Sequence, residues 1–197
     1  TNTSWASLGA GQTFEWYITV SDGTATTTGP TWTFHTTPGA DPVFVGVGDI
    51  ADCGNTNDTA TAAIVQGVDG TVFTTGDNVY PTGTAANFTA CYEPSWGVVK
   101  SRTRPIPGNH DWGTGVVNNL TGYFGYYGAN ATDANGKSYY SYDIAGSNWH
   151  VVNLDSECAL VTGGCADGSP QENWLQADLA ANSSKNVIAL FHKPRFS

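Results

Sequence analysis

The sequence has few basic side chains: its 197 residues include 7 Lys and Arg against 17 Asp and Glu, a formal net charge of −10. A protein that binds nucleic acid through its phosphates needs clustered basic side chains, and the few basic residues here are scattered along the sequence. We therefore expect no nucleic-acid-binding surface.

Long apolar runs are also absent. No stretch reaches the roughly 18 apolar residues of a membrane-spanning helix, so we expect no membrane span. The first residues lack a signal-peptide pattern, which would place any export signal upstream of Thr1.

Charged residues are scarce too, at 12%, whereas Gly is plentiful at 24 residues. This composition favours a secreted, loop-rich globular protein. The four cysteines include no C-x-x-C pair, and their even number favours two disulfides in an oxidising, extracellular compartment. Cys158 and Cys165 flank a Gly-rich turn that makes a local bridge easy, which leaves Cys53 to pair with Cys91. The alternative is free, buried thiols.

The N-terminal segment has a hairpin pattern. Apolar and polar residues alternate over 14–20 and again over 32–34, and 21–23 has turn chemistry. Two strands cannot form a stable sandwich alone, and the pattern resembles the closing strands of a fibronectin type III-like β-sandwich. The resemblance implies that residues 1–37 are the C-terminal strands of such a module, followed by a linker at 38–42.

The rest of the chain alternates apolar strands with helix-compatible stretches, which is a βαβ pattern and predicts an α/β (α+β) domain over 43–197. The expected strands are at 43–47, 71–75, 150–154 and 186–191. The expected helices are at 59–66 and 171–180.

Polar motifs stand at or near the ends of these strands, at 48–49, 76–80, 108–111 and 191–194. Loops at the carboxyl edge of an open α/β sheet converge on a crevice where ligands bind. The motifs supply carboxylate, amide and phenol oxygens together with imidazole nitrogen. This mixture suits both hard cations and transition metals, so we expect a pair of metal ions.

In their order and spacing, these motifs resemble those of the metallophosphoesterases (the calcineurin-like phosphoesterase superfamily), over about residues 43–197. The resemblance is to the purple acid phosphatases, with motifs GDxG, GDxxY, GNH[DE], a later His and then GHxH. Many metallophosphoesterases carry Asp-x-His in the first motif. This chain instead has Asp49-Ile50-Ala51 there and places Tyr80 three residues after Asp77. The resemblance implies a β-sandwich flanked by helices.

The resemblance also implies metal ligands. Asp49 and Tyr80 would bind a first ion, Fe(III), and Asp77 would bridge the two ions. Asn109 and His192 would bind a second, divalent ion: Fe, Zn or Mn. A phenolate ligand favours trivalent iron because its negative charge offsets that of the ion.

The implied activity is hydrolysis of phosphate esters, either small molecules or phosphorylated substrates, by a metal-bound hydroxide. His110 would contact the substrate phosphate or protonate the leaving group. Three nearby side chains are open to two interpretations each. Asp111 either orients His110 or caps a turn, Asn78 either supports a ligand or caps the backbone, and Asp52 either supports the site or is simply exposed.

The chain departs from the family pattern in two places. Ala51-Asp52 stands where the first motif has its second Gly, and no GHxH motif follows His192. We therefore expect a domain that is incomplete at its C-terminus, so the fragment's own activity is not predicted. One rival hypothesis is an extracellular binding or structural module that keeps the fold without turnover. Another is a nucleotidase or nuclease that uses other divalent ions.

The remaining aromatic and histidine residues are expected to be structural. His35 and His150 are interpreted as structural, and the aromatic runs at 123–127 and 139–142 as packing under long loops rather than as a substrate or sugar-binding face. Trp96 and Trp112 lie close to the motifs, and the sequence leaves open whether they line a pocket.

Overall fold

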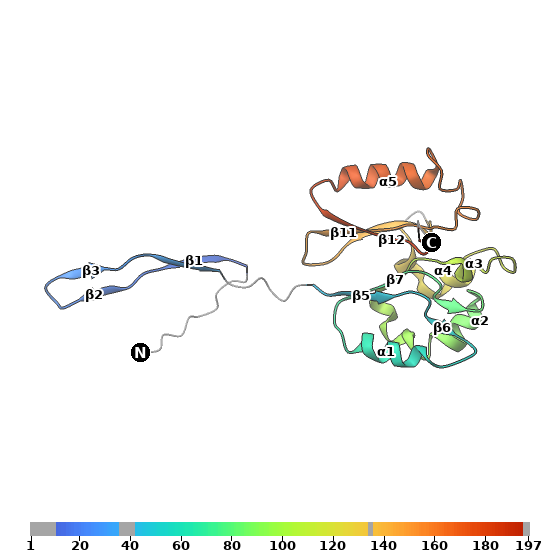
Figure 1. The fold of residues 1–197 in the computed structure, drawn as a ribbon, viewed down its shortest axis with the longest axis horizontal. Helices are drawn as coiled ribbons and strands as arrows, with labels where there is room; N and C mark the ends of the chain where they lie inside the picture. The colour runs from blue at the N-terminus through green and yellow to red at the C-terminus, as the bar shows by residue number, and fades with distance from the viewer. Residues whose placement is uncertain (1–10, 36–41, 134–135, 195–197) are drawn as a thin grey trace. The chain divides into compact units, whose positions relative to one another are not determined.

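The computed structural model describes residues 11–35, 42–133 and 136–194 (Figure 1). The chain divides into two compact units, one up to Asp41 and one from Pro42 onward. Most of the predicted linker, 38–42, lies outside the described residues, as do both ends of the predicted N-terminal module.

The first unit is an antiparallel ribbon, as predicted, but its alternating segment is interrupted. Strand β1 (Thr13–Trp16) pairs with β4 (Trp32–His35), and β2 (Thr19–Ser21) pairs with β3 (Thr26–Thr28). Between the two paired regions, residues 17–18 lie opposite residues 29–31, so two residues face three, and one of the three is Pro30. Proline has no N–H to donate and an extra residue makes a bulge, which explains why the alternating segment 14–20 is interrupted at 17–18.

The second unit contains all six predicted elements. They are β5 (Phe44–Val47), α1 (Asp58–Gln66), β7 (Thr71–Thr74), β11 (Trp149–Asn153), α5 (Pro170–Ala181) and β12 (Asn186–Leu190). Strand β5 precedes α1 in the chain and β7 follows it, and the two strands pair in parallel, which confirms the βαβ unit. The mixed α/β class is therefore confirmed.

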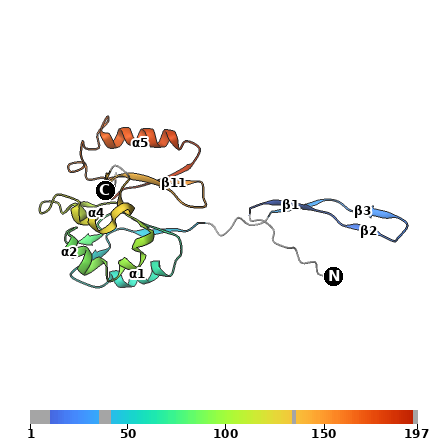
Figure 2. The same ribbon diagram turned by 180° about the vertical axis from the view of Figure 1, so that it is seen from behind.

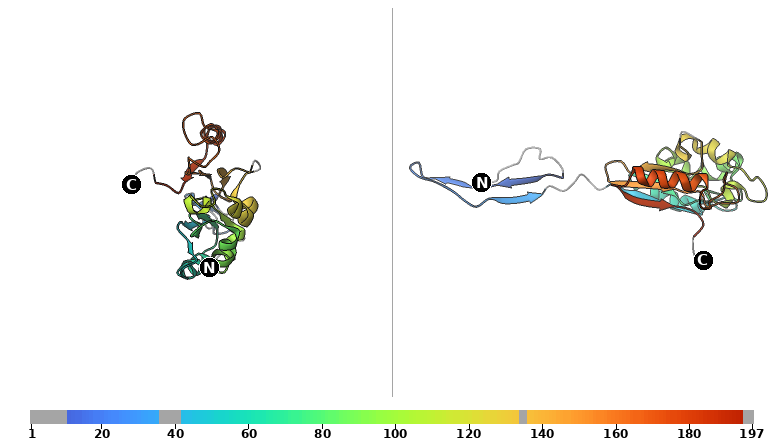
Figure 3. Two further views of the ribbon diagram at one scale, coloured as in Figure 1. Left: turned by 90° about the vertical axis from the view of Figure 1, so that its right-hand side faces the viewer. Right: turned by 90° about the horizontal axis from the view of Figure 1, so that it is seen from above.

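The strands of this unit form several small sheets. One has the order β5-β7-β9, with β9 at Thr103–Arg104, and another the order β10-β11-β12, with β10 at Tyr140–Asp143. A third is the parallel pair β6 (Ala51–Asp52) and β8 (Val79–Tyr80). Figure 1 shows α5 beside β11 and β12, and α1 on the far side beyond β5 and β7. The reverse view keeps this order (Figure 2), and the view from above shows α5 lying along the strands (Figure 3).

The main core lies on the α1 side of β7 and is strongly aromatic. It combines side chains of α1 and β7 with those of the helical segments 88–102 and of α4 (Thr121–Tyr127). Trp96, Tyr123 and Phe88 are fully buried, and most of the other aromatic side chains of 123–127 and 139–142 are buried or half-buried. These observations confirm that the aromatic residues pack, and they place Trp96 in the core rather than at a pocket mouth.

Both predicted disulfides, Cys53–Cys91 and Cys158–Cys165, are present, and the alternative of free thiols is excluded. Such pairs are compatible with a secreted protein. Across the described part of the chain, no helix has the length and apolar character to cross a membrane. His150, interpreted as structural, is buried, and each ring nitrogen lies 2.7 Å from a carboxylate oxygen, of Asp143 or Asp178.

Candidate metal centre

The first two motifs lie side by side because the chain segments after β5 and β7 stay paired. Beyond the strands, backbone N–H groups of Asp49, Ile50 and Ala51 donate to carbonyls of the second motif, and the pairing continues into β6 and β8. Asp49 stands two residues past the end of β5, and Asp77 three residues past the end of β7. Both have a positive φ, 56° and 51°, in the left-handed region. Aspartate tolerates this conformation better than most residues, and here it turns both carboxylates out of the strands.

Tyr80 joins these two carboxylates. Its hydroxyl oxygen lies 2.5 Å from Asp49 Oδ1 and 2.8 Å from Asp77 Oδ2, so it donates its proton to one of them at a time. Burial raises the pKa of the Tyr80 hydroxyl, and the hydrogen bonds to Asp49 and then Asp77 raise it further. The phenol therefore stays protonated at neutral pH unless a cation displaces its proton.

The third motif is fixed to the second by Asp111. Helix α3 (Asn109–Trp112) is a single turn, and the Asp111 carboxylate accepts hydrogen bonds from the backbone N–H of Gly108 and Asn78 and from the Asn78 side chain. Asp111 is completely buried, and burial raises its pKa to about 7, although these donors act in the opposite direction. Of the two interpretations, turn capping is therefore correct, and Asp111 also ties the two loops together. Its described hydrogen bonds do not include the His110 ring.

Gly108 allows this close approach. A Cβ there would lie 2.3 Å from Asp77 Oδ1 and 2.4 Å from the Asp77 backbone nitrogen. The neighbouring His110 N–H donates to Asp77 Oδ1 at 2.8 Å. Asp77 thus has one oxygen held by the third motif and the other facing Tyr80.

His192 and Asn109 form the other half of the cluster. His192 Nδ1 lies 2.8 Å from the Thr75 carbonyl, which can only accept, so Nδ1 carries a proton. Nε2 then lies 3.2 Å from Asn109 Oδ1 and 3.5 Å from Asp77 Oδ2. In a neutral ring this nitrogen presents a lone pair to two oxygen atoms. Metal-binding histidines commonly donate their second ring N–H to a carbonyl in this way.

His110 lies at the edge of the cluster. Its Nδ1 is 2.8 Å from the Pro81 carbonyl and therefore carries a proton, while its Nε2 is 3.9 Å from Asp77 Oδ2. The ring stacks obliquely on Tyr80, with 4.3 Å between ring centroids. Its side chain is 37% exposed, so Nε2 is accessible to a molecule that enters from solvent.

The structure thus brings all six predicted site residues together, as two groups that share Asp77. Asp49 and Tyr80 lie on one side of Asp77, and Asn109 and His192 on the other. Within residues 11–35, 42–133 and 136–194, no three side chains of His, Cys, Asp or Glu gather closely enough to hold a metal ion by themselves. A metal here depends on the phenol and the amide as well. The oxygen-rich donor set with one imidazole fits a hard cation beside a transition metal.

The other candidates have local roles. The Asp52 carboxylate is exposed and accepts from the Gly54 N–H and the Asn55 side chain, so it closes its own turn. The Asn78 side chain donates to Asp111 and to the Ile106 carbonyl, and it accepts from Tyr127. It therefore supports the loop beneath Asp77.

A surface hollow of about 320 Å³ opens beside the cluster, lined by Asp49, Ile50, Asp52, Asn55, Asn57 and Tyr80.

Asp155 was not predicted from the sequence, although it stands two residues past the end of β11, as Asp49 does past β5. It is 1% exposed, and its carboxylate accepts from the Trp112 indole N–H at 3.1 Å and from the Ser138 hydroxyl at 2.5 Å. Its position directly after the strand expected at 150–154 was the available signal. In comparisons with protein-family models, curated proteins and solved structures, nothing matches this chain.

Proposed function

We propose that the protein is a metal-dependent phosphoesterase that hydrolyses phosphate esters at a dinuclear site, of the purple acid phosphatase kind. One observation carries the proposal: donors from four separate chain segments meet around Asp77. The order of sheets and helices in Figure 1 is compatible with a sandwich flanked by helices. The disulfides favour a secreted protein.

In this proposal Asp49 and Tyr80 would hold Fe(III), Asn109 and His192 would hold a divalent ion, and Asp77 would serve both ions. This assignment is supported by Asp77 Oδ2, which lies 2.8 Å from the Tyr80 hydroxyl and 3.5 Å from His192 Nε2. Two cations held there would neutralise charge on the phosphate oxygens and supply a water-derived nucleophile near neutral pH.

The remaining chemistry belongs to His110. The Pro81 carbonyl fixes its tautomer, with Nδ1 as the donor. Its accessible Nε2 can hold a second proton and pass it to the departing oxygen of the ester, or it can contact a phosphate oxygen. The substrates are small phosphate esters or phosphorylated molecules that reach this exposed edge.

The test is reconstitution with Fe(III) and Zn²⁺, followed by metal analysis, a visible spectrum and assay of phosphate release from a chromogenic ester. We expect two metal ions per chain and a tyrosinate-to-iron absorption band. Tyr80→Phe should remove the band and weaken iron binding. The matched control is Tyr142→Phe, because the Tyr142 hydroxyl is buried without a hydrogen-bond partner among the described residues. A colourless iron-treated protein, with Tyr80→Phe indistinguishable from Tyr142→Phe, would contradict the proposal.

A further inference from the structure

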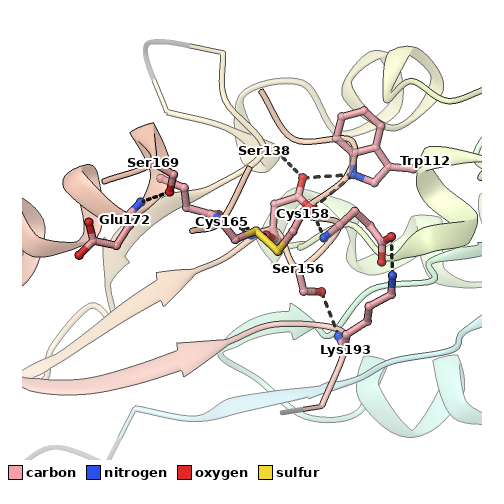
Figure 4. Close-up of a disulfide and its surroundings, with 11 residues drawn as sticks. Trp112, Ser138, Ser156, Cys158, Cys165, Ser169, Glu172 and Lys193 are labelled. Carbon is pink, nitrogen blue, oxygen red and sulfur yellow. Dashed lines mark hydrogen bonds and ion pairs between the residues drawn. A yellow bond between two sulfur atoms is a disulfide. The ribbon is translucent and has the colours of Figure 1, made fainter. Parts of the chain in front are cut away.

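A buried polar network lies next to the proposed second metal subsite. It connects the segments that carry Asn109 and His192, the two donors of that subsite. It runs through the loop after β11 and includes Asp155, Ser156 and Glu157. We refer to these three residues as the arm. Figure 4 labels Ser156 together with Trp112 and Lys193, the residues at the two ends of the network.

One end of the arm fixes α3. Asp155 accepts from the Trp112 indole N–H, and Trp112 is the last residue of the single helical turn that begins at Asn109. The Ser138 hydroxyl and the Glu157 N–H donate to the same carboxylate, so both of its oxygens are engaged. A turn this short moves as a unit, so a shift of Trp112 moves Asn109 with it.

The other end fixes the residue next to His192. The Lys193 N–H donates to the Ser156 hydroxyl at 2.9 Å, and Lys193 Nζ lies 2.7 Å from Glu157 Oε2. Glu157 is only 4% exposed, and its second oxygen, Oε1, has no hydrogen-bond partner within the described chain. Lys193 is therefore the cation that compensates a buried carboxylate, and breaking such a pair is costly.

The arm itself has a rigid base. Gln171 of α5 brackets the Asp155 backbone, since its Oε1 accepts the Asp155 N–H at 2.8 Å and its Nε2 donates to the Asp155 carbonyl at 2.9 Å. The Cys158–Cys165 disulfide begins one residue after Glu157 (Figure 4). The loop therefore cannot shift freely relative to α5.

We propose that the arm is a positioning device that sets the 3.2 Å separation between Asn109 and His192, and with it the affinity of the second metal subsite. This inference rests on the proposed function. The other subsite depends mainly on the backbone pairing of the first two motifs, which joins Asp49, Asp77 and Tyr80, and meets α3 through the His110 N–H on Asp77. The arm should thus affect the second metal far more than the first.

The experiment is a Zn²⁺ titration of the iron-loaded protein against a chelating indicator, with the visible band recorded in the same samples. Glu157→Gln and Lys193→Met each remove one charge of the pair. We expect each variant to bind Zn²⁺ about 10- to 100-fold more weakly, the usual effect of losing a group that orients a ligand. The iron content and the tyrosinate band should stay as in the wild type. Lys193→Arg should restore Zn²⁺ binding.

Glu172→Gln is the control, because Glu172 lies in α5 near the disulfide but makes no contact with Lys193 (Figure 4). If Glu157→Gln does not fold, Lys193→Met keeps the test open, since the Lys193 side chain is 53% exposed. Wild-type Zn²⁺ affinity in both variants overturns the inference and leaves the proposed function intact. Equal weakening of both metals also overturns it, because that result indicates general loosening. A wild-type protein that binds neither metal overturns the inference and the proposed function together.

Discussion

Replacing Asp111 should destabilise the protein more than loss of any exposed carboxylate. Its buried side chain is the acceptor for three N–H groups, from the backbones of Gly108 and Asn78 and from the Asn78 amide. Asp111→Ala leaves these donors buried without that acceptor, at a cost of about 1–3 kcal/mol each. Relaxation and water entry recover part of this, so we expect the free energy of unfolding to fall by about 3–5 kcal/mol. Asp111→Asn keeps one acceptor oxygen and should lose less.

The assay is urea unfolding in the presence of a chelator, so that metal binding does not contribute. It should be run at about pH 8.5, where a carboxyl of pKa about 7 is mostly ionised. Asp69→Ala is the control because Asp69 is exposed, and its effect should stay within about 0.5 kcal/mol. If Asp111→Ala unfolds within about 1 kcal/mol of that control, the carboxylate does not hold the two motifs together and the reasoning is wrong.

Three further results are expected. Gly108→Ala should lower stability by about 1–3 kcal/mol, because its Cβ would overlap the Asp77 backbone, and an unchanged melting temperature would contradict this. Burial raises the pKa of Asp155 above the 3.8 of an unfolded chain, so the folded state binds more protons and stability should fall as pH rises from about 4 through the raised pKa. Unfolding curves of Asp155→Asn should lack that part of the slope. Replacing Cys53 and Cys91 by Ser should cost about 4 kcal/mol from their 38-residue separation, measured by the same urea assay, and a loss below about 1 kcal/mol would refute the estimate.

The sequence predicted the longer elements well because each has a strong local cause. Strands β7 and β11 are rich in β-branched and aromatic residues, and α5 begins with Ser169 as an N-cap and Pro170 in its first turn. The pair β6 and β8 was missed because strands of two residues have no periodicity to detect. Their pairing arises only when the first two motifs lie side by side.

The site could be predicted as a set of residues but not as a geometry. Strand-end placement pointed to Asp49 and Asp77, yet nothing local in the chain shows that Tyr80 lies between their carboxylates or that Thr75 fixes the His192 tautomer. The arm was missed for a related reason. Its contact between Trp112 and Asp155 spans 43 residues, and a pairing that distant depends on the whole fold.

The backbone at the two aspartates bears on whether this cluster is functional. Asp49 and Asp77 both have a positive φ, which costs an L-residue roughly 1–2 kcal/mol relative to a helical or extended conformation. Glycine would adopt the same turn without that cost, and it would also remove two carboxylates that converge on one hydroxyl. The strain is therefore offset in part by the hydrogen bonds that these carboxylates accept from Tyr80 and, at Asp77, from the His110 N–H. Residues held in such conformations concentrate at ligand-binding and active sites. Under the proposed function, a cation between the two carboxylates would supply further compensating energy, so loss of the bound metal should destabilise these two loops.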